Sequence, residues 1–147
     1  MTDTEKILEF DRIKEKLAEL ACTEKARLQI QELKPSLSEL EVKAFQRETT
    51  EARKMIEICG NPPVTALQGV DGWIEFASKG GCLTPRQLEQ ISMVLAAVRR
   101  LKDYLRREKE HEIGLAYYEE NLDGLDDIRE ELGSKIRNER VDDYASK

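Results

Sequence analysis

The chain has 147 residues, of which 39% are hydrophobic and 37% are charged, and its net charge is -6 at pH 7. This length is enough for one domain with its own core, and the composition excludes a disordered chain and a membrane-embedded one. Because phosphate affinity comes mainly from accumulated Lys and Arg, an acidic chain is also not a general nucleic-acid binder.

The three cysteines, Cys22, Cys59 and Cys82, are odd in number and widely spaced, and no Cys-x-x-Cys pair occurs. This pattern is typical of reduced thiols in a cytoplasmic protein and does not support a zinc knuckle or a redox motif. The acidic residues after Met1 do not resemble a signal peptide. No stretch approaches the roughly 20 apolar residues that span a bilayer, so we expect a cytoplasmic chain without membrane contact.

The first helix is predicted over about Thr4–Ala21, because its apolar residues recur at spacings of three and four. These residues are Phe10, Ile13, Leu17 and Leu20. Thr23 is typical of the N-cap of a second helix, and Pro35 stops that helix.

Two serines, Ser36 and Ser38, each have a glutamate three residues later, which is the pattern of a capping box. We favour Ser38 as the N-cap, since a long helical pattern follows it. Gly60 is typical of a left-handed helix end. The segment 61–69 contains two prolines and is predicted to be an irregular loop.

The clearest helix start in the chain is Thr84–Gln87. Thr84 is a capping residue, Pro85 takes the first helical position, and a glutamine completes the box. The helix that follows is predicted to reach about Glu110 and to be the central strut of the fold. A short helix before it should end at Gly80–Gly81.

A weaker helix is predicted between Gly114 and Asn121, and a last one begins near Leu125. The tail 140–147 has no helical period, and no segment alternates like a strand. The whole pattern predicts an all-α fold, a compact helical bundle with a short non-helical tail. Its predicted buried side chains are Phe10, Ile13, Leu17, Phe45, Ile91, Leu95 and Val98.

The pattern predicts no catalytic, cofactor-binding or metal-binding residue. His111 is the only histidine, and a metal site there would need Glu108 or Glu112 as a further ligand. An exposed helix-end residue is the more usual role for such a histidine. The carboxylates between Glu119 and Glu131 lack the spacing of a calcium loop and indicate a solvated face.

One basic cluster could meet nucleic-acid phosphates. Four of its members repeat at spacings of three and four and share one side of the long helix. They are Arg99, Lys102, Arg106 and Lys109. Acidic residues interrupt the cluster, so simple solvation is favoured over nucleic-acid contact, and both interpretations stay open.

Several stretches resemble a bacterial MutS homologue of the type-two branch, which lacks a mismatch-recognition domain. Leu8–Ile13 and Glu32–Ser36 are similar to the opening of that family, a Leu-Glu-Phe-Asp entry and a later Leu-Lys-Pro turn. Ala77–Pro85 is similar to its Ala-x-x-Gly-Gly-x-Leu-Ser/Thr-Pro junction, and Arg99–Lys102 to its Arg-x-Leu-Lys run. Asp143–Ser146 is similar to an Asp-Ser-Ala-Ser element.

The resemblance implies an N-terminal helical core domain, 1–139, and a truncated tail, 140–147, that leads toward a lever and ATPase region. It implies a parent protein that is an ATPase and often a nuclease, with ATP and Mg as cofactors. Such a parent acts on DNA in recombination or repair control, or on stalled ribosomes, and forms a homodimer.

The chain itself has no Gly-x-x-x-x-Gly-Lys-Ser/Thr phosphate loop. We therefore predict that it is not an enzyme, carries no cofactor and supports the lever of the parent chain. The alternative is a free-standing helical module for protein–protein interaction.

Overall fold

The computed structural model of the chain describes residues 9–64, 69–137 and 140–141. These residues are mostly helical, which confirms the predicted all-α class. In chain order the elements are α2 (Phe10–Glu19), α3 (Glu24–Gln31), α4 (Glu39–Cys59), α5 (Asp71–Ser78), α6 (Pro85–Glu108), the 3₁₀ helices η1 (Lys109–His111) and η2 (Gly114–Asn121), α7 (Asp126–Lys135), and the strands β1 (Ile136–Arg137) and β2 (Arg140–Val141).

The predicted helix starts are confirmed at their capping residues. The Thr23 side chain accepts a hydrogen bond from an amide of the first turn of α3 at 3.1 Å. At the start of α6, the Gln87 amide donates to the Thr84 hydroxyl at 3.4 Å, and the Thr84 amide donates to the Gln87 side chain at 2.8 Å. This complete capping box satisfies amides that have no partner within the helix.

The predicted box at Ser38 is only half formed. The Ser38 side chain accepts from the Glu41 amide at 3.4 Å, as an N-cap should. The Glu41 carboxylate does not return to the Ser38 amide, because it accepts a hydrogen bond from the Ser36 hydroxyl instead. The Ser38 amide donates to that same Ser36 oxygen at 3.1 Å, so the two serines act together at this helix start.

The glycine pair after α5 ends the helix as predicted. Gly80 has a φ of 85°, a conformation that favours glycine. Its amide donates to Ala77 O at 2.9 Å, and the Gly81 amide donates to Phe76 O at 3.0 Å. These two bonds form a Schellman motif, which satisfies carbonyls at the helix end and turns the chain toward α6.

The core lies where the end of α4 meets the C-terminal half of α6. Met55, Tyr104 and Ile113 are buried together and are covered by partly buried leucines. The Tyr104 hydroxyl donates to Gly60 O at 2.8 Å, which fixes the end of α4 against α6. A buried tyrosine stabilises such a contact in two ways: its ring buries apolar area, and the hydrogen bond of its hydroxyl fixes the orientation of the two helices.

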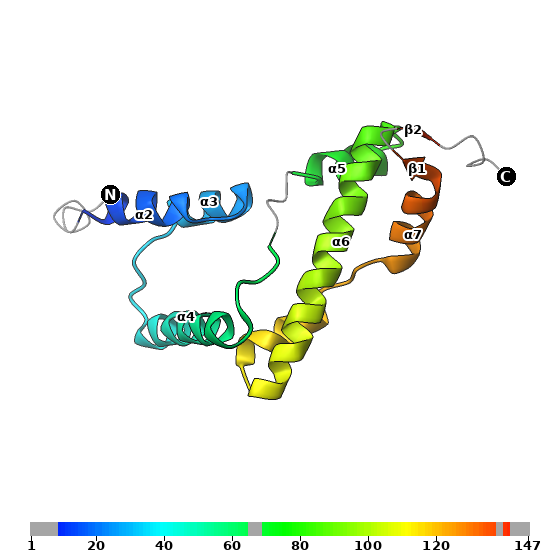
Figure 1. Cartoon of the computed structure of the whole chain (residues 1–147). Helices are drawn as coiled ribbons and strands as arrows, with labels where there is room; N and C mark the ends of the chain where they lie inside the picture. The colour runs from blue at the N-terminus through cyan, green and yellow to red at the C-terminus, as the bar shows by residue number, and fades with distance from the viewer. Residues whose placement is uncertain (1–8, 65–68, 138–139, 142–147) are drawn as a thin grey trace.

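The chain is more open than the predicted compact bundle. In Figure 1, α2 and α3 lie away from α6, which is the central strut for α7 and the 3₁₀ segment. Ile13, Leu17 and Phe45 were predicted to be buried but are 57%, 44% and 54% exposed. Ile13 and Leu17 are exposed because α2 packs mainly on α3 rather than on the long helix, and Phe45 lies on α4, whose main contact is with η2.

Three of the other predicted core positions belong to α6, and the fourth, Phe10, begins α2. Leu95 is buried, as predicted, whereas Phe10, Ile91 and Val98 are only partly covered. The long helix ends at Glu108 rather than Glu110, because its last residues tighten into η1.

Two short strands were not predicted. Ile136 pairs with Val141, and Arg137 with Arg140, in an antiparallel ladder of two residues each. Such short segments carry too little alternation to be recognised in a sequence. The ladder pairs residues on the two sides of the boundary predicted after residue 139. The division into a core domain, 1–139, and a tail, 140–147, stays a prediction. Among the described residues, no helix is long and apolar enough to cross a bilayer.

Replacing Leu95 by alanine tests the buried face of α6. Leu95 is 9% exposed, so Leu95→Ala should lower the free energy of unfolding by about 2–5 kcal/mol. Met93 is 65% exposed on the same helix, and Met93→Ala should change it by less than about 0.5 kcal/mol. Urea unfolding followed by circular dichroism measures both values. Equal small effects would show that Leu95 is not part of a folded core.

Candidate functional site

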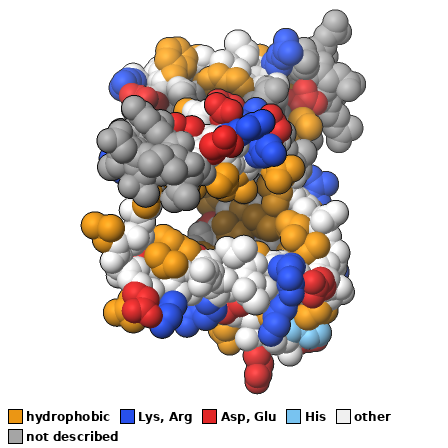
Figure 2. Space-filling model, turned by 90° about the vertical axis from the view of Figure 1, so that its left-hand side faces the viewer, with side chains coloured by type: hydrophobic (Ala, Val, Ile, Leu, Met, Phe, Trp, Pro, Cys, Tyr) orange, Lys and Arg blue, Asp and Glu red, His pale blue; other side chains and the backbone are white. Residues whose placement is uncertain are grey.

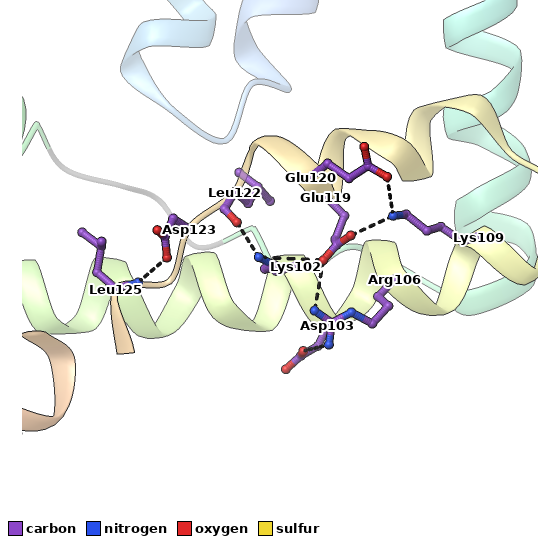
Figure 3. Close-up of polar contacts among 9 residues, drawn as sticks. All are labelled: Lys102, Asp103, Arg106, Lys109, Glu119, Glu120, Leu122, Asp123 and Leu125. Carbon is purple, nitrogen blue, oxygen red and sulfur yellow. Dashed lines mark hydrogen bonds and ion pairs between the residues drawn. The ribbon is translucent and has the colours of Figure 1, made fainter. Parts of the chain in front are cut away.

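Three of the four cations predicted as a nucleic-acid contact lie on α6, and the fourth, Lys109, is the first residue of η1. Figure 3 shows Lys102, Arg106 and Lys109 facing the segment that returns after α6. Arg99 Nη1 lies 2.6 Å from an oxygen of Asp126 at the start of α7. Lys102 Nζ donates to Leu122 O at 2.8 Å. The structure therefore brings the stripe together and gives these two members partners within the chain.

The other two members of the stripe meet a buried carboxylate, that of Glu119. Arg106 Nη2 donates to Glu119 Oε1 at 3.0 Å, and Lys109 Nζ donates to Glu119 Oε2 at 2.8 Å. Lys102 Nζ lies 3.9 Å from Glu119 Oε1 and adds a third positive charge. Lys109 also donates to Glu120 at the exposed edge, at 3.0 Å. One buried negative charge is thus surrounded by three cations, two from α6 and one from the residue that follows it.

The geometry of η2 explains why Glu119 is buried. In a 3₁₀ helix, residues three apart lie on the same side, which places Ala116 and Glu119 together. Ala116 has no exposed surface and Glu119 is 6% exposed. The alanine methyl group allows η2 to come close to α6. The glutamate then reaches the cations that recur every three or four residues along that helix.

The charges of this cluster shift the pKa values of its members. The pKa of Glu119 is lowered, mainly because Lys109 and Arg106 donate hydrogen bonds to the charged form, although burial opposes this. The pKa of Lys109 is raised, mainly by its bonds to Glu119 and Glu120. The pKa of Asp126 is lowered first by the hydrogen bond from Arg99. All of these shifts favour the ionised pairs seen in the structure.

The sequence missed the partners of the stripe. The carboxylates after residue 118 were interpreted as a solvated face, but Glu119 is buried and Asp126 is ion-paired. The sequence did contain one indication of this pairing. A basic stripe is followed by an acidic segment that is long enough to fold back and form ion pairs with it. Nucleic-acid contact by the stripe stays a prediction. Arg100 and Arg107 lie next to the stripe in the sequence, and neither forms an ion pair with a described residue.

A second polar contact joins the returning segment to α4. Glu51 Oε2 accepts from the Leu115 amide at 2.9 Å, and a β-carbon at Gly114 would lie 2.9 Å from the same oxygen. Glycine at this position therefore permits the close approach. An open groove lies beside this contact. Charged residues of α4 line one side of it, and Tyr117 and Tyr118 of η2 are among the residues on the other.

The structure also brings His111 next to Glu108 and Cys59. The ligand atoms of these three residues lie within 4.8 Å of one another. Glu108 could be considered as a partner of His111 from the sequence, because the two residues are three positions apart. Cys59 could not, because it belongs to α4, which is far away in the chain.

The chain is similar to curated proteins named Endonuclease MutS2. It is 37% identical over 144 residues to the protein of Clostridium botulinum strain Kyoto, a match that covers 96% of this chain and 18% of that relative. It is 38% identical over 104 residues to the protein of Clostridium beijerinckii, covering 71% and 13% of the two chains. The identity to the protein of Clostridium botulinum strain Eklund 17B is 32% over 145 residues, covering 96% and 18%.

The chain thus spans less than a fifth of the length of these relatives. No family model matches it, and no solved structure matches it. The identities show homology to part of a MutS2-like protein.

Neutralising Glu119 tests whether the buried carboxylate holds the returning segment. Glu119→Gln should lower the unfolding midpoint at neutral pH more than Glu120→Gln, because Glu120 pairs with Lys109 at an exposed position. Thermal unfolding followed by circular dichroism gives both midpoints. If the two variants lose equal stability, the buried pairing contributes no more than an exposed one.

Acid unfolding provides an independent check. A carboxyl group whose pKa is lower in the folded chain stabilises it above the unfolded pKa of about 4.5, and this contribution is lost as the pH falls below that value. The wild-type chain should therefore lose stability below about pH 4.5 more steeply than Glu119→Gln. The variant should keep some acid dependence, since the pKa of Asp126 is lowered too. Identical pH profiles would contradict the assignment.

Proposed function

We propose that this chain is a non-catalytic helical segment of a MutS2-like protein, in which α6 supports the lever of the parent chain. The similarity supports this role, because it extends over 96% of this chain but only 18% of each of two Clostridium botulinum relatives. Any ATPase or nuclease activity of the parent then resides in other residues, together with its ATP and Mg.

The observation that carries the proposal is the amount of apolar side chain left exposed on α2 to α5. These large exposed side chains include Leu17, Leu28, Phe45, Ile56, Ile74 and Phe76. Figure 2 shows, on the side of the molecule where α2, α3 and α4 lie, a hollow with hydrophobic side chains around it and at its back. Apolar surface of this extent is typical of an interaction site, and the occupant we propose is the remainder of the MutS2-like chain.

The long helix is suited to support a lever. α6 has 24 residues and is therefore about 36 Å long, at a rise of 1.5 Å per residue. Its start is fixed by a complete capping box, and its second half is held by the cations that pair with η2 and α7. A helix braced in this way moves as a rigid rod, so a displacement at one end reaches the other.

In this proposal the parent protein acts on DNA in recombination or repair, or on stalled ribosomes, and can form a homodimer. The chain described by the structure contributes support rather than the main nucleic-acid contact, since its four stripe cations have partners within the chain. A free-standing interaction module is the second candidate. It would use the same apolar surface for a different protein.

The purified chain should neither bind nor hydrolyse ATP. The reason is that its sequence has no phosphate loop to hold the triphosphate. Nucleotide binding is measured by fluorescence of a labelled ATP, and turnover by phosphate release. Turnover that remains after repeated purification, and that follows the chain through a sizing column, would contradict the non-catalytic role.

A chimaera tests the supporting role directly. The matching region of Clostridium botulinum Endonuclease MutS2 is replaced by this chain, and amide hydrogen exchange is compared between the chimaera and the isolated chain. Amides of α2 to α4 should exchange more slowly in the chimaera, because the rest of the protein covers them. Phe45→Asp in the chimaera should reverse this protection, whereas the exposed polar change Gln46→Asp should not. Equal exchange in the two settings would favour the free-standing module.

A further inference from the structure

The ends of three helices meet at one point, and each ends on a side chain that can bind a metal ion. Cys59 is the last residue of α4, Glu108 is the last of α6, and His111 is the last of η1. One ligand atom from each lies within 4.8 Å of the others. This meeting point lies at the junction that also holds the core.

Glu108 is the most unusual member of the group. Its side chain is fully buried, at 0% exposure, and neither carboxylate oxygen has a hydrogen-bond partner among the described residues. Burying a charged group without a partner is costly, so such groups in folded proteins are paired or bind metal ions. A carboxylate oxygen of Glu108 lies within 4.8 Å of the ligand atoms of Cys59 and His111. A cation bound between the three residues would supply the missing partner.

The donor set identifies the class of cation. A thiolate, an imidazole and a carboxylate are the three ligand types of Zn²⁺ in proteins. Mg²⁺ and Ca²⁺ prefer oxygen ligands alone, and a thiolate disfavours both. Three protein ligands leave a fourth tetrahedral position for water. Because Cys59 and His111 are exposed, the ion can enter from solvent.

We propose that Cys59, Glu108 and His111 bind a Zn²⁺ ion that fastens the end of α4 to the end of α6. This site goes beyond the supporting role and does not depend on it. It revises the sequence analysis, in which His111 was interpreted as a solvated helix-end residue.

The surroundings fix the main chain at this site and leave the Glu108 carboxylate poorly satisfied. Tyr104 donates its hydroxyl to Gly60 O at 2.8 Å, which positions the main chain next to Cys59. The Cys59 thiol lies close to the Glu108 carboxylate, with ligand atoms of the two residues within 4.8 Å. A thiol is a weak donor, and no well-formed hydrogen bond joins it to either oxygen. The Glu108 carboxylate therefore lacks a strong hydrogen-bond donor, because the Cys59 thiol beside it is a weak one.

Only a small closure is needed to complete the site. Ligand atoms around tetrahedral Zn²⁺ are about 3.3–3.6 Å apart, from metal–ligand distances of about 2.0–2.3 Å. The present separations are within 4.8 Å. Rotations of the exposed Cys59 and His111 side chains about their own bonds can supply the difference, while the buried Glu108 stays in place.

The direct test is Zn²⁺ binding by the whole chain, purified without metal in a non-chelating reductant. Competition with a chromogenic chelator should give one Zn²⁺ per chain. Cys59→Ser and His111→Gln should each weaken binding by about tenfold or more, since losing even an outer-shell partner costs that much. Both residues are exposed, so neither change should unfold the chain. Cys82→Ser is the matched control, because it removes another exposed thiol.

Two further measurements separate this site from binding by other thiols. Co²⁺ in place of Zn²⁺ should give a thiolate-to-cobalt charge-transfer band that Cys59→Ser abolishes and Cys22→Ser leaves intact. Zn²⁺ should raise the thermal unfolding midpoint of the chain relative to EDTA, as any ligand of the folded state does, whereas Mg²⁺ should not. Glu108→Gln should remove the Zn²⁺-dependent rise, and the exposed change Glu110→Gln should keep it.

The absence of Zn²⁺ binding by the wild-type chain would overturn the proposal. Binding that depends on Cys22 or Cys82 rather than Cys59 would overturn it as well. So would Glu108→Gln with an undiminished response to Zn²⁺, because the buried carboxylate would then have no part in the site.

Discussion

The returning segment of this chain is held by a carboxylate that folding has removed from water. Glu119 reaches the surface of α6 from η2, where Arg106 and Lys109 donate to its two oxygens and Lys102 adds charge. Leaving a buried carboxylate unpaired is costly, so these cations favour the position of η2 in which Glu119 meets them. Arg99 and Asp126 then extend the same pairing to α7.

Other contacts follow from this placement. Once η2 lies on α6, the Leu115 amide meets Glu51 of α4, and Ile113 joins Met55 and Tyr104 in the core. The end of α4 is thereby held from two directions. Among the described residues, α2 and α3 pack mainly on each other, and their side chains Ile13, Leu17 and Leu28 stay exposed. The chain therefore has a braced half around α6 and an open half with exposed apolar side chains, which we propose the rest of a larger protein covers.

Local signals in the sequence predicted most helix boundaries, whereas long-range pairing was not predictable from them. Thr23, Thr84 and the Gly80–Gly81 pair determine helix ends through bonds to their own neighbours, so each could be recognised without a structure. Burial depends on which helix covers which face. The apolar stripe of α2 predicted a buried face, but in the part of the chain that the structure describes α2 packs mainly on the short helix α3. The same limit applies to Glu119 and to Cys59, whose partners lie on other helices.

A double-mutant cycle between Glu119 and Lys109 tests the central interaction most directly. Glu119→Gln, Lys109→Met and the double variant are compared by urea unfolding, and the cycle gives the coupling free energy of the pair. A second cycle between Glu120 and Lys109 serves as the exposed reference. The buried pair should show a clearly larger coupling than the exposed one. Additive effects in the first cycle would contradict the account, because Glu119 would then not be held by its cations.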